Sequence, residues 1–204
     1  PLMAAVAGGA DYVFTPEDPA GQGWQDDLAE HLRLGREAGR RESIVLVAEG
    51  AHDRDGNELS TQLIADTIQE RTGEDARVTI LGHVQRGGTP SAYDRWMSTL
   101  LGYAAVQEIL DSSAEDEPVI LGVRRNRITR VPLMKAVRDT RAVKDLIAAG
   151  DYAAAQASRG SSFSSMVGIY HLLSTPPQLI PEPTGDSKRV AILHAGGLAP
   201  GMNT

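Results

Sequence analysis

The alternation of strand-like apolar runs with helical segments constrains the fold of this chain more than any other feature. Residues 43–50 contain a continuous apolar run, which is typical of a strand covered on both faces of a parallel sheet. Shorter apolar runs at 12–16 and 77–81 are predicted as further strands. The segments between and after them have helical spacing or helix-start signals, at 24–39, 60–72 and 91–110. This order predicts an α/β fold on a parallel sheet.

The second part of the chain predicts a hairpin, two helices and then a change of composition. Residues 118–123 and 128–132 are the expected hairpin strands, and helices are expected at 133–149 and 151–173. The stretch 174–187 holds four of the chain's 11 prolines, which is typical of an exposed linker. A fresh apolar strand is expected at 189–195, so the residues indicate the end of one α/β domain, a linker and the start of a second.

Charge and cysteine content exclude several classes of function. The 204 residues carry 20 Lys and Arg against 27 Asp and Glu, a net charge of −7. The net negative charge of the chain does not favour binding to nucleic acid or to an anionic membrane. No apolar run reaches the roughly 18 residues that a membrane-spanning helix needs. The absence of Cys excludes disulfides and thiolate metal sites. The basic cluster Arg124, Arg125, Arg127 and Arg130 is interpreted as a solvated hairpin tip in preference to a nucleic-acid patch.

The segment GHVQRGGTP, residues 82–90, carries the sharpest chemical signal. In parallel sheets ligands bind at the carboxyl ends of strands, where Glu49 and the pair His83 and Arg86 are expected. Arg offers a planar fork of donors for phosphate, and a carboxylate accepts hydrogen bonds from sugar hydroxyls, so the combination predicts a phosphosugar site. The alternative is structural: His83 caps a turn and Arg86 pairs with Glu49.

Arg77, at the opposite end of the strand expected at 77–81, is separated from His83 by roughly 15 Å. It therefore either forms a surface ion pair or reaches the pocket of a neighbouring subunit. Asp11 and Arg40 also precede strands at that same edge of the sheet. One interpretation is a second ligand site or an interface, and the other is that both are solvated surface charges. The turn containing Gly196 and Gly197 follows the last expected strand, where a phosphate cradle would lie, although it matches no complete phosphate-binding motif.

The segment VTILGHVQRGGTPSAYDR, residues 78–95, resembles the signature of the 6-phosphofructokinase family. Other segments resembling the family occur in the expected order, namely GGADYVFTPE, IVLVAEGA, VPLM and RGSSF, at 8–17, 44–51, 131–134 and 159–163. AILHAGGLAPGMN, residues 191–203, resembles the family's opening turn but comes after the signature. The arrangement therefore resembles the large double-headed, eukaryotic-type members, with the end of a first half at 1–175, a linker at 176–186 and the start of a second, regulatory half at 187–204.

The resemblance implies an incomplete three-layer, Rossmann-like phosphofructokinase fold and a cytoplasmic, allosteric, glycolytic homotetramer. It implies phosphoryl transfer from MgATP to fructose 6-phosphate. By motif match, Glu49, His83 and Arg86 would bind fructose 6-phosphate, and Arg77 would reach the phosphate held by a partner subunit. Asp11 and Arg40 match effector-site positions of smaller bacterial relatives. Gly196-Gly197-Leu198 departs from the family's Gly-Gly-Asp, which argues against a second catalytic site.

The resemblance also implies parts that this segment does not supply. The general base and most of the Mg²⁺ and ATP site are expected before Pro1, so no catalytic residue and no metal ligand is predicted here. Because residues expected there choose the phosphoryl donor, a pyrophosphate-dependent relative remains the enzymatic alternative. A non-catalytic sugar-phosphate-binding regulatory half is the alternative from another class.

Overall fold

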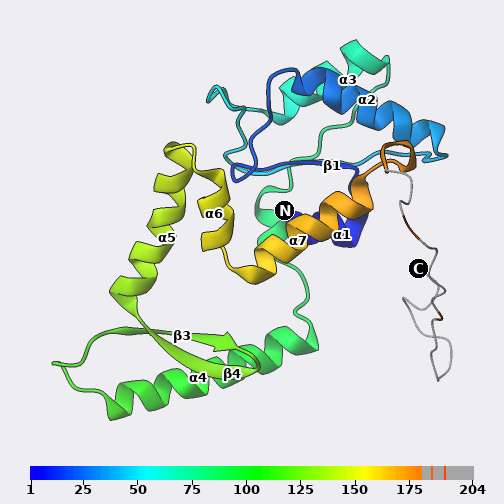
Figure 1. Ribbon diagram of the computed structural model, residues 1–204. Coiled ribbons are helices and arrows are strands. Elements are labelled where there is room, and N and C mark those ends of the chain that lie inside the picture. The colour runs from blue at the N-terminus through cyan, green and yellow to red at the C-terminus, as the bar shows by residue number, and fades with distance from the viewer. Residues whose placement is uncertain (181–184, 186–190, 192–204) are drawn as a thin grey trace.

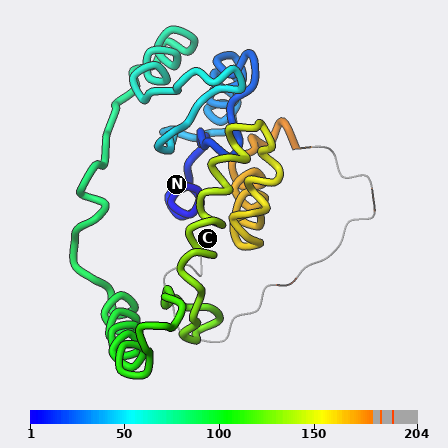
Figure 2. Tube along the Cα trace, turned by 90° about the vertical axis from the view of Figure 1, so that its left-hand side faces the viewer, coloured from blue at the N-terminus to red at the C-terminus, as the bar shows by residue number. Residues whose placement is uncertain are grey.

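The computed structural model describes residues 1–180, 185 and 191, and these form two groups of elements (Figure 1). One group holds a short parallel sheet with its covering helices. The other holds a long helix, α4 (Ala92–Asp111), with a hairpin beside it. Figure 2 shows the connection 73–91 between them running apart from both groups. The linker beyond 180 and the expected start of a second half at 187–204, with Gly196 and Gly197, lie outside the described residues except for 185 and 191.

The sheet of the first group is parallel, as predicted. Strand β1 (Tyr12–Phe14) pairs with β2 (Val45–Val47), with Tyr12 opposite Val45 and Phe14 opposite Val47. Alternate side chains point to opposite faces of a strand, and here both faces are covered. Tyr12, Val45 and Val47 pack into one core cluster, whereas Val13 and Leu46 pack into another.

Helices from distant parts of the chain supply the two covering layers. Helices α2 (Trp24–Glu37) and α3 (Thr61–Thr72) cover one face, around the buried Trp24, Leu28 and Ile64. Helices α1 (Leu2–Gly8) and α7 (Ser161–Ser174) cover the other, around Leu2 and Tyr170. The result is a helix–sheet–helix sandwich, which confirms the predicted three-layer α/β architecture.

Local signals start and end α3 where the sequence predicts. Ser60 has an extended backbone, and its Oγ accepts a hydrogen bond from Leu63 N at 3.1 Å. Gly73 closes the helix with φ 74°, the left-handed conformation that glycine adopts without a steric cost. Helix α4 begins directly after Ser91, close to its predicted start, and the structure adds a capping box between Ser91 and Asp94.

The second group contains the predicted hairpin. Strands β3 (Val119–Arg124) and β4 (Arg127–Pro132) pair antiparallel through a two-residue turn. Arg130 on β4 pairs with Glu108 on α4, which ties the hairpin to the helix. Helix α5 (Leu133–Ala148) then leads back to the first group through α6 (Tyr152–Ser158).

Three predictions about secondary structure are wrong. The run 77–81 is not a strand: Val78, Ile80 and Leu81 are 41%, 79% and 55% exposed, and no strand pairs with them within the described part of the chain. The residues Gly87, Gly88 and Pro90 predict irregular backbone throughout 82–90, but a 3₁₀ helix, η1, spans Gly82–Arg86. The helix expected over 151–173 is divided into α6 and α7 at Gly160, whose φ of 95° is incompatible with a continuous helix.

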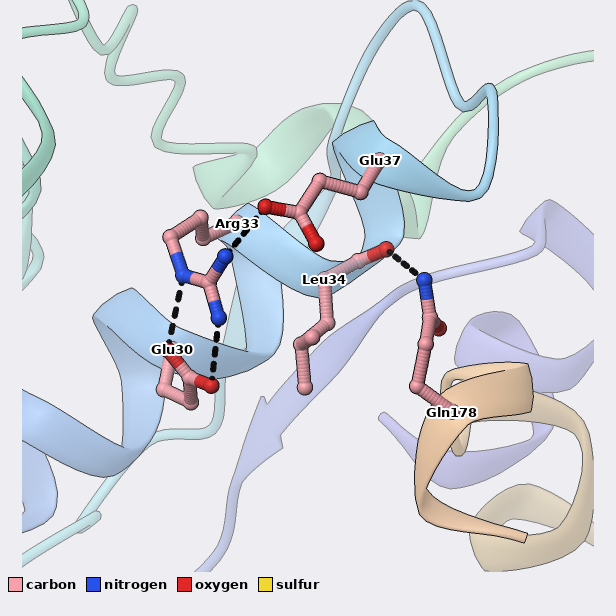
Figure 3. A network of polar contacts seen from close by, with 5 residues as sticks. All are labelled: Glu30, Arg33, Leu34, Glu37 and Gln178. Atoms are coloured by element: carbon pink, nitrogen blue, oxygen red, sulfur yellow. Dashed lines mark hydrogen bonds and ion pairs between the residues drawn. The ribbon is translucent and has the colours of Figure 1, made fainter.

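The proline-rich stretch begins as a packed segment where an exposed linker is expected. Ser174 and Pro176 are buried, and a short 3₁₀ turn, η2 (Pro177–Leu179), follows. Gln178 Nε2 donates to the carbonyl oxygen of Leu34 near the end of α2, at 3.3 Å (Figure 3). Residues 176–179 are therefore anchored to the first group. Of the described residues, no helix combines the length and apolar character that a membrane crossing requires.

Candidate functional site

Asp11 and Arg40 form the best-defined polar contact among the predicted site residues. Asp11 lies just before β1 and is only 4% exposed. One of its carboxylate oxygens pairs with the Arg40 guanidinium, and the other accepts a hydrogen bond from Ile44 N at 2.8 Å. The interpretation as solvated charge is therefore wrong for Asp11, because its carboxylate is buried and fixes the entry of the chain into β2.

The chain after α2 folds back closely enough for Arg40 to reach Asp11. Arg40 N donates to Gly35 O at 3.1 Å, across the last turn of the helix. A Cβ atom on Gly35 would lie 3.3 Å from Cδ of Arg40, so a larger residue there would push the Arg40 side chain away. Gly35 is buried and adopts ordinary helical backbone; it matters here for space rather than for its φ.

A cavity of about 360 Å³ opens beside this ion pair. It is lined by α1, by the segments before β1 and β2, and by Tyr170 and Leu173 of α7. Arg41 and Glu42 also line it, whereas the charge of Arg40 is already paired with Asp11. Burial raises the pKa of the Tyr170 phenol, whose OH donates to the backbone oxygen of Asp11 at 3.5 Å. The cavity combines two cations, two carboxylates and a neutral phenol, which suits a small polar ligand.

The four predicted substrate residues are exposed, and only His83 and Arg86 lie on the same element. Glu49 lies in the turn after β2, His83 and Arg86 lie on η1, and Arg77 lies in the open connection before it. Among the described residues no hydrogen bond or ion pair joins any two of them. Arg86 therefore does not pair with Glu49, and the structural alternative for that pair is not observed. Because 77–81 is not a strand here, the strand-based separation of Arg77 from His83 is not observed either.

A second cavity, of about 330 Å³, lies between β1 and α7 and was not expected from the sequence. His31 of α2 lines it, packs edge-on against Tyr12, and has a buried Nε2 without a partner among the described residues. Burial lowers the pKa of His31, which favours the neutral form of this imidazole. His171 and Asp18 line the same cavity with Nε2 and Oδ2 3.8 Å apart.

Glu17 is another buried acid that sequence reasoning missed. It is 4% exposed, pairs with Arg159, and its carbonyl oxygen accepts from Gln156 Nε2 at 2.9 Å. One signal for the position of Glu17 is present in the sequence, since Glu17 directly follows the strand expected at 12–16. Its two polar partners come from α6 and the residue that caps it, about 140 residues further along the chain, and no local sequence pattern reports that contact.

Comparison with known proteins identifies the family. The phosphofructokinase family model matches residues 1–109, which is more than half of the chain. This range includes six of the predicted site residues, namely Asp11, Arg40, Glu49, Arg77, His83 and Arg86. The ATP-dependent 6-phosphofructokinases of Aspergillus fumigatus and Aspergillus niger are 43% and 44% identical over 99% of the chain.

A solved structure agrees with this result. The phosphofructokinase of Saccharomyces cerevisiae superposes with a TM-score of 0.80 at 38% sequence identity, covering 85% of this chain and 23% of that one. The chain spans about a quarter of the length of the curated relatives, 25% and 26% for the two Aspergillus enzymes. On the family match over residues 1–109 and the agreement of fold, this chain belongs to the phosphofructokinase family.

Proposed function

We propose that this chain is part of an enzyme that transfers a phosphoryl group from MgATP to fructose 6-phosphate, giving fructose 1,6-bisphosphate and ADP. The observation that carries the proposal is the 43–44% identity, over 99% of the chain, to proteins named ATP-dependent 6-phosphofructokinase. Catalysis of phosphoryl transfer depends on positioning the two substrates and on stabilising the charge of the transition state. A segment that binds the acceptor sugar therefore contributes directly to the reaction.

The segment supplies the fructose 6-phosphate site in this proposal. Arg86 and His83 bind the sugar phosphate, and Glu49 accepts hydrogen bonds from the sugar hydroxyls. All three are exposed, so none has to break a buried contact in order to meet the substrate. Their positions also fall inside the stretch matched by the family model.

Arg77 acts on the phosphate bound by a neighbouring subunit in this proposal. It lies in an exposed connection and forms no ion pair within the described part of the chain, which leaves its guanidinium available to another subunit. Mixed oligomers test the role. Subunits carrying Arg77→Ala and subunits carrying Arg86→Ala should regain some intact sites when combined. Verified hetero-oligomers without any regained activity would remove the assignment in trans.

The cavity beside Asp11 and Arg40 serves as an effector or phosphate site in this proposal. An anionic ligand there would compete with the Asp11 carboxylate for Arg40, because the two side chains are already paired. Arg41, which lines the same cavity, supplies a second cation. Gly196 and Gly197 would belong to a separate phosphate cradle at the start of the second half.

Catalysis needs groups beyond this segment. Among the described residues no cluster of three or more His, Asp or Glu side chains is placed to hold a metal ion. In this proposal the Mg²⁺ and ATP sites and the general base belong to other parts of the full-length protein. The full-length protein is proposed to be a cytoplasmic homotetramer. The isolated 204-residue chain should show no turnover in a coupled assay, and measurable turnover by the purified chain would contradict this division.

A donor comparison tests the proposed reaction. The full-length protein should form fructose 1,6-bisphosphate with MgATP and not with Mg-pyrophosphate. Turnover with pyrophosphate alone would establish the pyrophosphate-dependent alternative. Binding of fructose 6-phosphate without turnover on either donor would instead favour a regulatory sugar-phosphate-binding half.

A further inference from the structure

The turn that joins β3 to β4 carries an arginine in an unfavourable backbone conformation. Arg125 and Asn126 form this two-residue turn, and both have positive φ, 53° and 60°. Hairpin turns of this kind favour Asn and Gly, because a Cβ crowds the backbone in the left-handed region. Asn126 suits its position, whereas Arg125 costs stability that a glycine would avoid.

The pairing register adds an electrostatic cost at the same tip. Arg124 and Arg127 are directly opposite each other in the ladder, so their side chains leave the hairpin on one face. Val123 and Ile128, the adjacent pair, are half-buried and point to the other face. Like charges that face each other across two strands repel, so the sequence places a repulsive pair where a neutral residue would be more stable.

Neighbouring residues do not relieve this repulsion. Arg130 is paired with Glu108, but none of Arg124, Arg125 and Arg127 has a carboxylate within ion-pair distance in the described part of the chain. Behind the two opposed arginines on the same face lies the pair Gly122 and Thr129, whose hydroxyl is directed to the Gly122 oxygen at 3.4 Å. The residues next to the two arginines on this face of the hairpin, Gly122 and Thr129, are therefore small.

We propose that Arg124 and Arg127 together bind a phosphate monoester dianion at the hairpin tip. A phosphate monoester carries nearly two negative charges at neutral pH and three acceptor oxygens, which matches two adjacent guanidinium forks. A single carboxylate would neutralise only one of the two. The site lies outside the 1–109 family match and is independent of the proposed sugar-phosphate site.

Two sources can present this group, a free phosphate ester or a phosphorylated side chain of a partner protein. A nucleic-acid backbone is disfavoured by the net charge of −7 and by the lack of aromatic residues in β3, β4 and their turn. Both remaining sources use the same contact, a phosphate held between opposed guanidinium groups.

Arginine Nε–Hε NMR resonances test the site directly, with inorganic phosphate as the first probe at constant ionic strength. The resonances of Arg124 and Arg127, assigned by their loss in Arg124→Gln and Arg127→Gln, should shift with saturation. Either substitution should weaken binding about tenfold or more, and lowering the pH from 7.5 to 5.5 should weaken it because the phosphate gains a proton. The matched control Arg141→Gln removes an exposed arginine of α5 and should leave the affinity unchanged.

The second set of probes is glycerol phosphate and a phosphoserine peptide with its unphosphorylated counterpart. Tighter binding of the phosphopeptide than of glycerol phosphate would indicate a phosphorylated partner, and equal affinity would indicate a free ester. Shifts that stay linear and equal for all exposed arginines would reveal only ionic screening and would overturn the proposal. Affinities unaffected by both Arg124→Gln and Arg127→Gln, in variants whose thermal unfolding shows a folded protein, would overturn it as well.

Discussion

Replacing Asp11 by alanine should destabilise the fold strongly, because its carboxylate joins two parts of the chain in the interior. The substitution removes the partner of Arg40 and the acceptor of Ile44 N, 2.8 Å from the carboxylate. Both contacts hold the segment before β2 against the segment before β1. We therefore expect the segment before β2 to be held less firmly, with only the backbone hydrogen bonds of Asp11 N and Tyr12 N to Ile44 O left at this point.

The expected cost follows from the exposure of the two side chains. Breaking a fully buried ion pair from one side costs about 3–5 kcal/mol. The Arg40 side chain is 30% exposed and recovers some hydration, which reduces that figure, whereas the unpaired Ile44 N–H adds about 1 kcal/mol. The net loss should be about 3–4 kcal/mol in the free energy of unfolding, or a fall of roughly 6–16 °C in Tm.

Urea unfolding of four variants would measure this cost. Arg40→Ala should also destabilise, because it leaves the Asp11 carboxylate, 6% exposed, without its cation. The double variant should cost clearly less than the sum of the two single ones. Asp139→Ala, which breaks the exposed Lys135 pair, is the matched control and should cost less than about 1 kcal/mol. An Asp11→Ala loss no larger than that of Asp139→Ala would refute the reasoning.

Three further predictions concern stability. Burial lowers the pKa of His31 in the folded state below its ordinary 6.5, so the unfolded chain takes up a proton at a higher pH than the folded chain does. The free energy of unfolding should therefore fall as the pH drops below about 6.5. His31→Gln should reduce this fall, measured as the urea midpoint between pH 7.5 and 5.5. Ser91→Ala removes the acceptor for Asp94 N at 3.2 Å and should cost about 1 kcal/mol, measured by urea unfolding against Ser113→Ala as a loop control. Arg125→Gly relieves the left-handed backbone and should raise the free energy of unfolding by up to about 1 kcal/mol; a loss would show that the arginine stabilises the turn.

Elements set by local chemistry are predictable from this sequence. The Ser60 cap and the Gly73 stop define α3, and the Asn126 turn defines the hairpin, because each signal acts within a few residues. Gly160 is a local signal for a break in the helix expected over 151–173. A glycine can also lie inside a helix, so the break becomes evident only from the φ of 95° that Gly160 adopts in the structure.

Features that depend on distant partners are not predictable in this way. The run 77–81 has the composition of a strand, but a strand also needs a neighbour with which to exchange hydrogen bonds, and no described residue supplies one. The sequence places Asp11 and Arg40 at the same edge of the sheet, before the strands. Their ion pair, however, depends on the way the chain folds back after α2, where Arg40 N donates to Gly35 O. The roles of Glu49, Arg77, His83 and Arg86 remain predictions, since all four are exposed and no hydrogen bond or ion pair joins any two of them among the described residues.

The steady-state kinetics of Arg86→Ala in the full-length protein test most directly whether this segment binds the acceptor sugar. Loss of a charge-assisted contact to the sugar phosphate, on the order of 1.5–3 kcal/mol, should raise KM for fructose 6-phosphate about tenfold to a hundredfold. His83→Ala should act in the same direction, and KM for ATP should remain close to the wild-type value in both variants. Arg141→Ala, on the exposed surface of α5, should change neither constant. Unchanged KM for fructose 6-phosphate in both Arg86→Ala and His83→Ala would contradict the account.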